Sequence, residues 1–336
     1  MTHPSAQDGE IRFDPLMQQW VIMAPARGGR PKDHSEPQSP RKAAGAHDPA
    51  CPFCPGNEAR LGEIILETAG PTDWATRVVA NKYPALAPDA ARHHFHEGPY
   101  GKTGAYGRHE VVIESPRHDR HPGAMTASEI EPLVETYHRR YNDLIGINKT
   151  VLVLIFRNHG WRAGTSLVHP HSQIVATEIR PRRVQRREDA ARRYYDQEGR
   201  CLLCDLLAFE IRDGRRLLWH NDAFAAFVPF AADVPYETWI VPKKHRADFG
   251  RLDDGLKTDL AASLQRALGG LAARLDDPDY NYMIHSAGRR HTDAPHLHWY
   301  VRIAPRLTTR AGFEIGSGIS INPSLPEDDA AFLRGN

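Results

Sequence analysis

The segment SLVHPHSQIVATE, residues 166–178, has the pattern of a β-strand that carries polar side chains on one face. Because successive side chains of a strand point to opposite faces, His169, His171 and Gln173 should project on the same side. Most polar strand faces are simply exposed to water, but neighbouring imidazoles also bind metals or act in catalysis. Other motifs in the chain distinguish an exposed polar strand from a functional one.

A second copy of this region follows 127 residues later. Segment 109–118, HEVVIESPRH, resembles segment 236–245, YETWIVPKKH, and the histidines of HPH, 169–171, match those of HLH, 296–298, at the same offset. An apolar pattern with helical spacing lies between the two motifs in each copy. This combination favours an internal duplication of domain size rather than a chain of short repeats.

Each copy predicts a strand, a helix and two further strands, and the short connections between strands favour antiparallel pairing. The predicted fold class is α+β, with two fused halves that each consist of an antiparallel sheet and a long helix. These halves are expected at residues 1–190 and 195–336, joined by a solvated Arg-rich connector at 180–193. The two cysteine pairs are offset by 150 rather than 127 residues, so extra residues are expected in the loop-like segment 85–107.

The composition excludes several function classes. The chain of 336 residues is 40% hydrophobic and 25% charged, which is ordinary for a globular protein. Its net charge of +1 argues against nucleic acid or a membrane surface as a partner. No apolar run approaches the roughly 18 residues of a membrane span, and the N-terminus does not resemble a signal peptide. A cytoplasmic location is therefore expected.

All four cysteines lie in two C-x-x-C pairs, CPFC at 51–54 and CLLC at 201–204. In a reducing compartment such pairs indicate metal ligands or redox dithiols, and the Pro- and Gly-rich surroundings of the first pair favour a metal. Two thiolates and two imidazoles form a closed tetrahedral zinc site. The expected zinc ligands are Cys51, Cys54, His118 and His169 in the first copy and Cys201, Cys204, His245 and His296 in the second, where His285 and His298 are alternatives. One site built from all four cysteines is the rival arrangement.

If the first histidine of HPH binds a metal, His171 remains on the same face as a nucleophile or general base. The Gly-containing loop 158–166, NHGWRAGTS, leads into this strand, and its amides could bind phosphate oxygens together with Ser166 and Gln173. At the 127-residue offset Gln173 is matched by Tyr300, so the second copy is expected to be a scaffold without catalysis.

Four motifs together resemble the galactose-1-phosphate uridylyltransferase family, a branch of the histidine-triad superfamily with two fused histidine-triad-like halves. The motifs are HPHSQ at 169–173, CPFC at 51–54, NKYPAL at 81–86 and RFDPLMQQWVIMAPARGGRP at 12–31. The C-terminal GFEIGSGISINPSLPED, 312–328, is also similar to the plant ADP-glucose phosphorylase type of this family. The resemblance covers the chain from about residue 10 to residue 330.

The resemblance implies a ping-pong reaction of galactose metabolism, in which His171 takes the uridylyl group from UDP-glucose and passes it to galactose 1-phosphate. It also implies a homodimer. Bacterial members have a carboxylate and histidines at the second metal site, usually described as iron, whereas Cys201 and Cys204 indicate a second zinc ion here. The residues that the resemblance assigns to catalysis are His171, Gln173 and Ser166, and those that it assigns to substrate binding are Arg27, Arg30, Phe53, Asn81, Asn158, Gly164, Phe313 and Glu314. The alternatives are the same chemistry on ADP-glucose, or a zinc-dependent nucleotide-binding module without catalysis.

Overall fold

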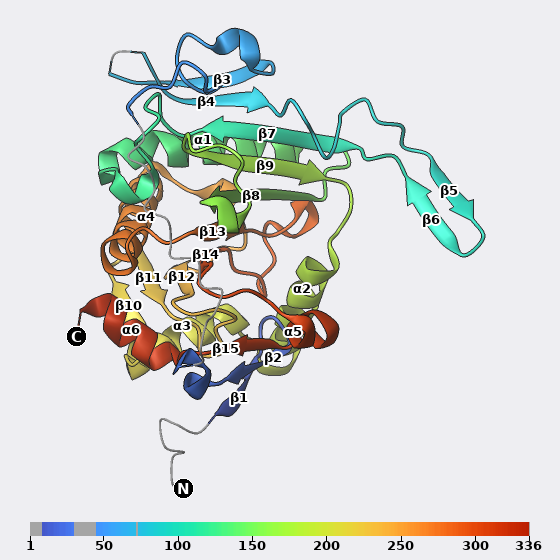
Figure 1. Cartoon of the computed structure of the whole chain (residues 1–336). Coiled ribbons are helices and arrows are strands. Elements are labelled where there is room, and N and C mark those ends of the chain that lie inside the picture. Colours follow the sequence, from blue (N-terminus) through green and yellow to red (C-terminus); the bar gives the residue numbers. More distant parts are fainter. Residues whose placement is uncertain (1–8, 30–44, 72, 336) are drawn as a thin grey trace, which may run out of the picture.

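The computed structural model describes residues 9–29, 45–71 and 73–335. Its centre is an antiparallel sheet of ten strands in the order β10-β11-β12-β14-β13-β8-β9-β7-β4-β3 (Figure 1). These strands are β3 (Ile64–Ala69), β4 (Trp74–Ala80), β7 (Gly107–Ile113), β8 (Leu152–His159), β9 (His171–Thr177), β10 (Leu217–His220), β11 (Phe224–Phe227), β12 (Thr238–Pro242), β13 (Tyr280–His285) and β14 (Tyr300–Pro305). The predicted mixture of helices with antiparallel strands is confirmed.

The strands of both predicted halves belong to one sheet, so the expectation of two separate sheets is wrong. β8 of the first half pairs with β13 of the second, with Ile155 opposite Ile284. This pairing satisfies backbone groups that would otherwise remain at two open sheet edges. Outward from this junction, the strand order is β8, β9, β7, β4, β3 on one side and β13, β14, β12, β11, β10 on the other.

Two long helices, α1 (Ala127–Gly146) and α4 (Asp254–Leu275), pack against each other and against the sheet. α1 begins with a capping box in which Thr126 and Glu129 bond to each other's backbone N–H groups. The apolar faces of both helices, including Leu133 on α1, join strands of both copies in one core. A buried leucine contributes roughly 1.5–3 kcal/mol relative to an exposed one, so this shared core holds the two copies together.

The remaining elements surround the sheet. The other α-helices are α2 (Arg182–Glu198), α3 (Leu202–Asp213), α5 (Gly312–Ser317) and α6 (Pro326–Arg334), and short 3-10 helices span Pro25–Gly29, Glu58–Arg60, Pro122–Ala124, Trp161–Ala163, Phe249–Arg251 and Arg289–His291. β1 (Glu10–Asp14), β2 (Gln19–Met23) and β15 (Ser320–Asn322) form a three-stranded sheet, and β5 (His94–Glu97) pairs with β6 (Tyr100–Thr103). Among the residues that the structure describes, no helix has the length and apolar character needed to cross a membrane.

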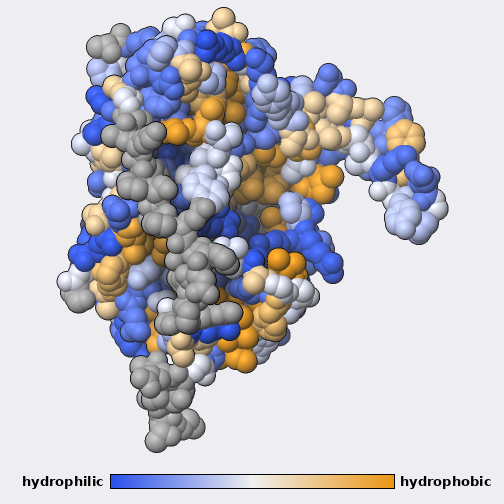
Figure 2. All heavy atoms as spheres, in the orientation of Figure 1, coloured by the Kyte–Doolittle hydropathy of each residue, from blue (hydrophilic) through white to orange (hydrophobic). Residues whose placement is uncertain are grey.

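Two segments differ from the expectation. Most of the Arg-rich segment is the helix α2 rather than a solvated connector, and Arg187, Glu188 and Ala191 of this helix are buried. The extra segment of the first copy contains the hairpin β5–β6, which projects from the body of the molecule (Figures 1 and 2). All residues of β5 are exposed, so the alternation of buried and exposed residues that reveals a strand in a sequence is absent there.

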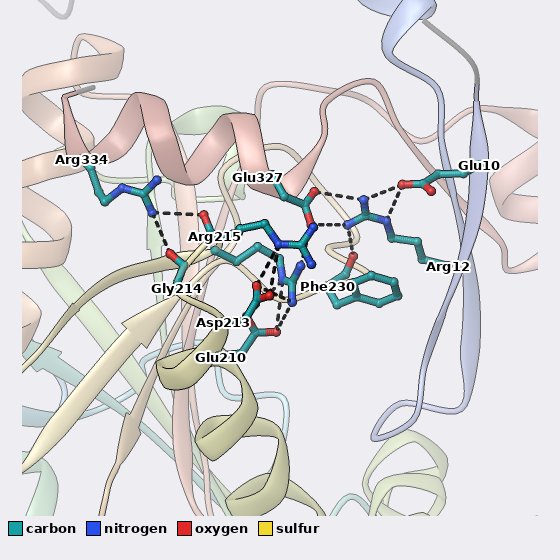
Figure 3. A network of polar contacts seen from close by, with 10 residues as sticks. Glu10, Arg12, Glu210, Asp213, Gly214, Arg215, Phe230, Glu327 and Arg334 are labelled. Atoms are coloured by element: carbon teal, nitrogen blue, oxygen red, sulfur yellow. Dashed lines mark hydrogen bonds and ion pairs between the residues drawn. The ribbon is translucent and has the colours of Figure 1, made fainter. Parts of the chain in front are cut away.

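The first and last strands that the structure describes meet on the C-terminal half. β2 pairs in parallel with β15, and Glu327 of α6 lies beside Arg12 of β1 (Figure 3). Its carboxylate is 3.0 Å from Nη2 of Arg12 on β1 and 2.6 Å from Nη1 of Arg216. Arg216 also pairs with Glu210 of α3 at 3.0 Å. The N-terminal strands are thereby attached to the half that does not carry His171.

Candidate active site and metal centres

The first Cys-x-x-Cys pair meets two histidines from the sheet. Sγ of Cys54 lies 3.5 Å from Nδ1 of both His118 and His169. Together with Cys51 these residues form a buried group of converging ligand atoms. Two thiolates and two imidazoles are the donors of a tetrahedral zinc site, whose bonds are about 2.3 Å to sulfur and 2.0 Å to nitrogen. The predicted donor set therefore comes together in the folded chain and fits a metal ion.

Hydrogen bonds around this group orient its ligands. Nε2 of His169 donates to the carbonyl of Ser115 at 2.8 Å, which leaves Nδ1 for a metal. The backbone N–H of Asp48 points at Sγ of Cys54 from 3.2 Å. Burial lowers the pKa of His169 to about 4, so its imidazole is in the neutral form that binds metals.

The second pair forms an equivalent group with His245 and His298. Sγ of Cys204 lies 3.3 Å from Nδ1 of each of these histidines, and Cys201 completes the group. Cys201 is the N-cap of α3 and Cys204 lies in its first turn. Hydrogen bonds from Cys204 and from the two histidines lower the pKa of Cys201, which favours the thiolate form that binds metals.

His296, the predicted fourth ligand, is not in this group, and His298 takes its place. β14 begins at Tyr300, two residues after His298, just as β9 begins at His171, two residues after His169. The connection before β14 is longer than the one before β9, because it runs from 286 to 299 rather than from 160 to 170. A constant sequence offset therefore assigned the wrong histidine of HLH to the metal.

The two cysteine pairs belong to separate groups, so the rival site with four cysteines is wrong. The other alternative ligand, His285, is also outside the second group. Its ring lies 4.7 Å from that of Tyr300, and its Nδ1 accepts a hydrogen bond from Arg187 at 2.7 Å. His285 therefore takes part in a buried polar contact of the second half.

His171 is the first residue of β9. Its Nδ1–H donates to the backbone carbonyl of His169 at 2.8 Å. This bond selects the neutral tautomer in which Nε2 has no proton and can attack an electrophile. The side chain is 7% exposed, and this burial lowers its pKa below the usual value, with the nearby Arg157 acting in the same direction. The imidazole of His171 is therefore neutral and oriented, as the predicted nucleophile requires.

The first cysteine pair places Phe53 against both histidines of HPH. Its ring meets the rings of His169 and His171 nearly edge-on, with centroid distances of 6.0 and 5.3 Å. Because Phe53 lies between Cys51 and Cys54, a metal bound by these cysteines would also fix one wall beside the nucleophile.

Gln173 is held by His109, a residue to which the sequence analysis gave no role. Nδ1 of His109 accepts a hydrogen bond from the backbone N–H of Ala85 at 3.1 Å, so the ring proton lies on Nε2. That nitrogen donates to Oε1 of Gln173 at 2.7 Å, and the predicted Asn81 lies 3.2 Å from it. The NH2 group of Gln173 is thus oriented to donate to a substrate. In the sequence, the one feature that pointed to His109 was its position at the start of the repeated segment 109–118.

A cavity of about 580 Å³ extends from His171 along the loop between β8 and β9. The predicted Asn158 and Ser166 both line it. Asn281 donates to Oδ1 of Asn158 at 2.7 Å, so the NH2 group of Asn158 is left to donate elsewhere. Gly164 has a φ of 93°, a left-handed conformation that glycine adopts without strain. The structure thus brings the nucleophile and the predicted phosphate-binding loop together.

A buried ion pair underlies this cavity. Nε of Arg157 lies 2.9 Å from Oε2 of Glu114, and the two side chains are 2% and 0% exposed. Arg157 also lines the cavity, so its positive charge is close to the position where a phosphate would bind.

Ser172 projects from the opposite face of β9, where its Oγ accepts a hydrogen bond from the hydroxyl of Tyr137 at 2.7 Å. Ser172 therefore links β9 to α1 and does not enter the cavity.

Three residues assigned by the resemblance lie elsewhere in the chain. Arg27 is in the exposed 3-10 helix after β2, and Phe313 and Glu314 belong to α5. None of these three lines the cavity beside His171, and Figure 1 shows α5 close to β2 and β15. Arg30 lies outside the described residues. One copy of the chain therefore does not bring these residues to the nucleophile.

Known proteins resemble this chain along most of its length. Residues 3–181 and 187–324 match the N-terminal and C-terminal domains of "Galactose-1-phosphate uridyl transferase". ADP-glucose phosphorylase of Arabidopsis thaliana is 35% identical over 98% of this chain and 93% of its own length. Galactose-1-phosphate uridylyltransferase of Thermotoga maritima is 30% identical over 97% of this chain and 98% of its own. The crystal structure of an Arabidopsis thaliana ADP-glucose phosphorylase with bound ADP-glucose has a TM-score of 0.84 at 32% identity, and the match covers 98% of this chain and 99% of that one. On these grounds the chain belongs to the galactose-1-phosphate uridylyltransferase family of nucleotidyltransferases.

Proposed function

We propose that the protein is a hexose-1-phosphate uridylyltransferase, which moves the uridylyl group of UDP-glucose to galactose 1-phosphate through His171. The observation that carries this proposal is the 2.8 Å hydrogen bond from Nδ1 of His171 to the carbonyl of His169, which leaves Nε2 unprotonated. An imidazole in this state attacks phosphorus readily and, once phosphorylated, is a good leaving group.

The proposed reaction has two steps, each of which forms one bond to phosphorus and breaks another. In the first, Nε2 of His171 attacks the α-phosphorus of UDP-glucose, an N–P bond forms, and the P–O bond to glucose 1-phosphate breaks. The sugar phosphate leaves as an anion that needs no added proton. In the second, a phosphate oxygen of galactose 1-phosphate attacks the same phosphorus, the N–P bond breaks, and the neutral imidazole is restored.

Residues around the nucleophile bind the phosphates during both steps. The NH2 group of Gln173, oriented by His109, donates to a non-bridging oxygen of the transferred phosphate. Asn158 and Ser166 bind the phosphate of the leaving or entering sugar, and Arg157 supplies positive charge beneath them. Because Gln173 does not titrate, it holds the intermediate without acting as a base toward water.

Zinc is the ion that we assign to both cysteine groups. The residues that would hold it are Cys51, Cys54, His118 and His169 in one group and Cys201, Cys204, His245 and His298 in the other. Four protein ligands close the coordination shell, so the ion supplies a structural cross-link. In the first group this cross-link fixes Phe53 and the backbone carbonyl of His169 beside the nucleophile.

A homodimer is part of the proposal. Arg27, Phe313 and Glu314 lie apart from the cavity, so they would reach a substrate there only if a partner protomer supplied them. The projecting hairpin exposes Phe95 and Tyr100 by 51% and 74%, which gives a second copy an apolar surface to cover. Mixing the two single variants His171→Asn and Phe313→Ala should restore part of the activity that each lacks. If subunit exchange restores no activity, the shared site is contradicted.

The matching strand order on the two sides of the β8–β13 junction supports an internal duplication into two histidine-triad-like halves. We place these halves at about residues 1–190 and 195–336, and the two family matches meet nearby, between 181 and 187. Metal groups built from unpaired cysteines suit a reducing compartment, so we place the enzyme in the cytoplasm.

A second candidate is transfer of the adenylyl group of ADP-glucose to phosphate. It is favoured by the 35% identity and the TM-score of 0.84 that relate this chain to the Arabidopsis ADP-glucose phosphorylase. The covalent step on His171 is the same in both candidates. They differ in the base that the pocket accepts and in the second substrate.

Isotope exchange separates the two candidates. The protein is incubated with radiolabelled glucose 1-phosphate and either UDP-glucose or ADP-glucose, without a second acceptor. A ping-pong enzyme moves the label into the sugar nucleotide that it uses. Label in UDP-glucose supports the first candidate, and label in ADP-glucose alone supports the second. Label in neither would contradict both.

A further inference from the structure

A third cluster of ligand-type side chains adjoins the cavity beside His171. A nitrogen of His121, a nitrogen of His159 and an oxygen of Asp277 all lie within 4.8 Å of one another. His159, at the end of β8, and Asp277, just after α4, both line the cavity. His121 is the N-cap of the 3-10 helix that precedes α1. Three separate segments thus bring these side chains to one place, outside the two cysteine groups.

The distances within this cluster suit metal coordination. Nε2 of His159 is 2.9 Å from Oδ1 of Asp277, and Nε2 of His121 is 3.7 Å from Oδ2. Ligand atoms at about 2.0–2.2 Å from one tetrahedral ion are about 3.3 Å apart. The three side chains, each with a ligand atom within 4.8 Å of the others, therefore converge closely enough to share one ion after small side-chain shifts. The two imidazole rings lie with centroids 4.7 Å apart, so both rings face the same carboxylate.

The backbone holds Asp277 in this position and connects it to the cavity loop. Asp276 and Asp277 follow α4 with φ values of 54° and 48°, a left-handed conformation that costs a residue other than glycine roughly 1–2 kcal/mol. Two residues further on, a carboxylate oxygen of Asp279 accepts a hydrogen bond from the backbone N–H of Arg162 at 2.8 Å. The same turn therefore presents one carboxylate to the histidines and another to the loop that lines the cavity.

We propose that His121, His159 and Asp277 bind a divalent transition-metal ion, which coordinates a phosphate oxygen of the substrate in the cavity. Two imidazoles and a carboxylate are donors for ions such as Zn²⁺, Mn²⁺ and Fe²⁺, and three protein ligands leave positions for water or substrate. The cysteine groups, with four ligands each, leave none. The phosphate contact rests on the proposed function, because that function places substrate phosphates in this cavity.

Mn²⁺ is the probe that separates this site from the cysteine groups, because it prefers oxygen and nitrogen donors to thiolates. Zinc-loaded protein is titrated with Mn²⁺, and the electron paramagnetic resonance signal of the free ion reports binding. We expect one saturable Mn²⁺ per chain, with affinity at least tenfold weaker in His159→Gln and Asp277→Asn. Asp276→Asn removes the same charge one residue away and keeps a residue that tolerates the left-handed backbone, so it should bind Mn²⁺ as the unmodified protein does.

The zinc content of each variant serves as the control for folding, because the cysteine groups form only in the folded chain. No saturable Mn²⁺ in the unmodified protein, or equal affinity in Asp277→Asn, would overturn the site. Glucose 1-phosphate should tighten Mn²⁺ binding severalfold, also in His171→Asn, where no covalent transfer occurs. An unchanged affinity would overturn the phosphate contact. Since both readouts are independent of turnover, their failure is distinct from failure of the proposed reaction.

Discussion

β9 and β14 occupy equivalent places in the two halves of the sheet but carry different chemistry. His171 and Gln173 on β9 correspond to Tyr300 and Arg302 on β14, because each strand begins two residues after a histidine of its metal group. Gln173 accepts its hydrogen bond from Nε2 of His109. The first half therefore presents polar groups that are still able to bond to a substrate.

In the second half, charges pair with each other. Arg302 lies 2.7 Å from Glu237 and 3.0 Å from Asp233. Tyr300 is 1% exposed, with the rings of Trp239 and His285 at 4.8 and 4.7 Å. The two halves therefore differ in whether the polar groups at these positions retain donors for another molecule, which is why we assign catalysis to the first half.

The largest expected effect comes from the first position of each strand. His171→Asn removes the nucleophile and should lower kcat by about 10³-fold or more. Tyr300→Phe removes only a hydroxyl in the corresponding place of the other half, and kcat should stay within about twofold. Steady-state rates with zinc content as the folding control test this pair. Comparable losses in both variants would break the assignment of catalysis to one half.

The two metal groups should also differ. Cys51→Ser and Cys201→Ser should each release one zinc ion and destabilise the fold, since each opens a closed site. Only Cys51→Ser should also lower kcat strongly, by about 10–100-fold, because its group positions Phe53 and His169. Elemental analysis and rates at low temperature check both effects. Retention of both ions in either variant would remove that group from the account.

Glu114 and Glu237, the buried carboxylates that pair with Arg157 and Arg302, allow a further comparison of the two halves. Glu114→Gln leaves the buried Arg157 without its charged partner, which typically costs about 3–5 kcal/mol of unfolding free energy. Glu237→Gln should cost less, because Arg302 keeps Asp233 at 3.0 Å. Only Glu114→Gln should also reduce kcat in the protein that remains folded, because Arg157 lines the cavity. Denaturant unfolding combined with initial rates measures both quantities. An equal effect of the two variants on kcat would argue against a role of Arg157 at the phosphate.

The smallest expected effect is that of His109, which acts through Gln173. His109→Phe removes the donor to Oε1 of Gln173, so kcat should fall by about tenfold with little change in KM or stability. His109→Gln keeps an N–H donor and should recover part of the loss. If both variants lose stability and activity in parallel, His109 is merely structural.

The sequence predicted the parts of the site that depend on local spacing. C-x-x-C and H-x-H place donors on a knuckle and on one strand face, so the first metal group and His171 followed from residue intervals. The choice of His298, an alternative ligand, over His296 did not follow from them, because a longer connection before β14 shifted the alignment by two residues. The role of His109 could not be predicted from residue intervals, because it depends on the pairing of β7 with β9.

The pairing of β8 with β13, which makes one sheet of the two halves, could also not be predicted from the sequence. β8 and β13 have the apolar character of any central strand, and their pairing is a contact between segments more than a hundred residues apart. Hydrophobic periodicity identifies such strands without saying which partner each one takes. The position of residues Gln19–Met23 on the C-terminal half was unpredictable for the same reason.

The most direct measurement is peptide mass spectrometry of the protein after rapid mixing with UDP-glucose or ADP-glucose and quenching at alkaline pH, where phosphoimidazoles survive. The account predicts a peptide containing His171 that is heavier by one nucleotidyl group (a nucleoside monophosphate less one water), and no such peptide from His171→Asn. An adduct on another residue, or none while the enzyme turns over, would contradict covalent transfer through Nε2 of His171.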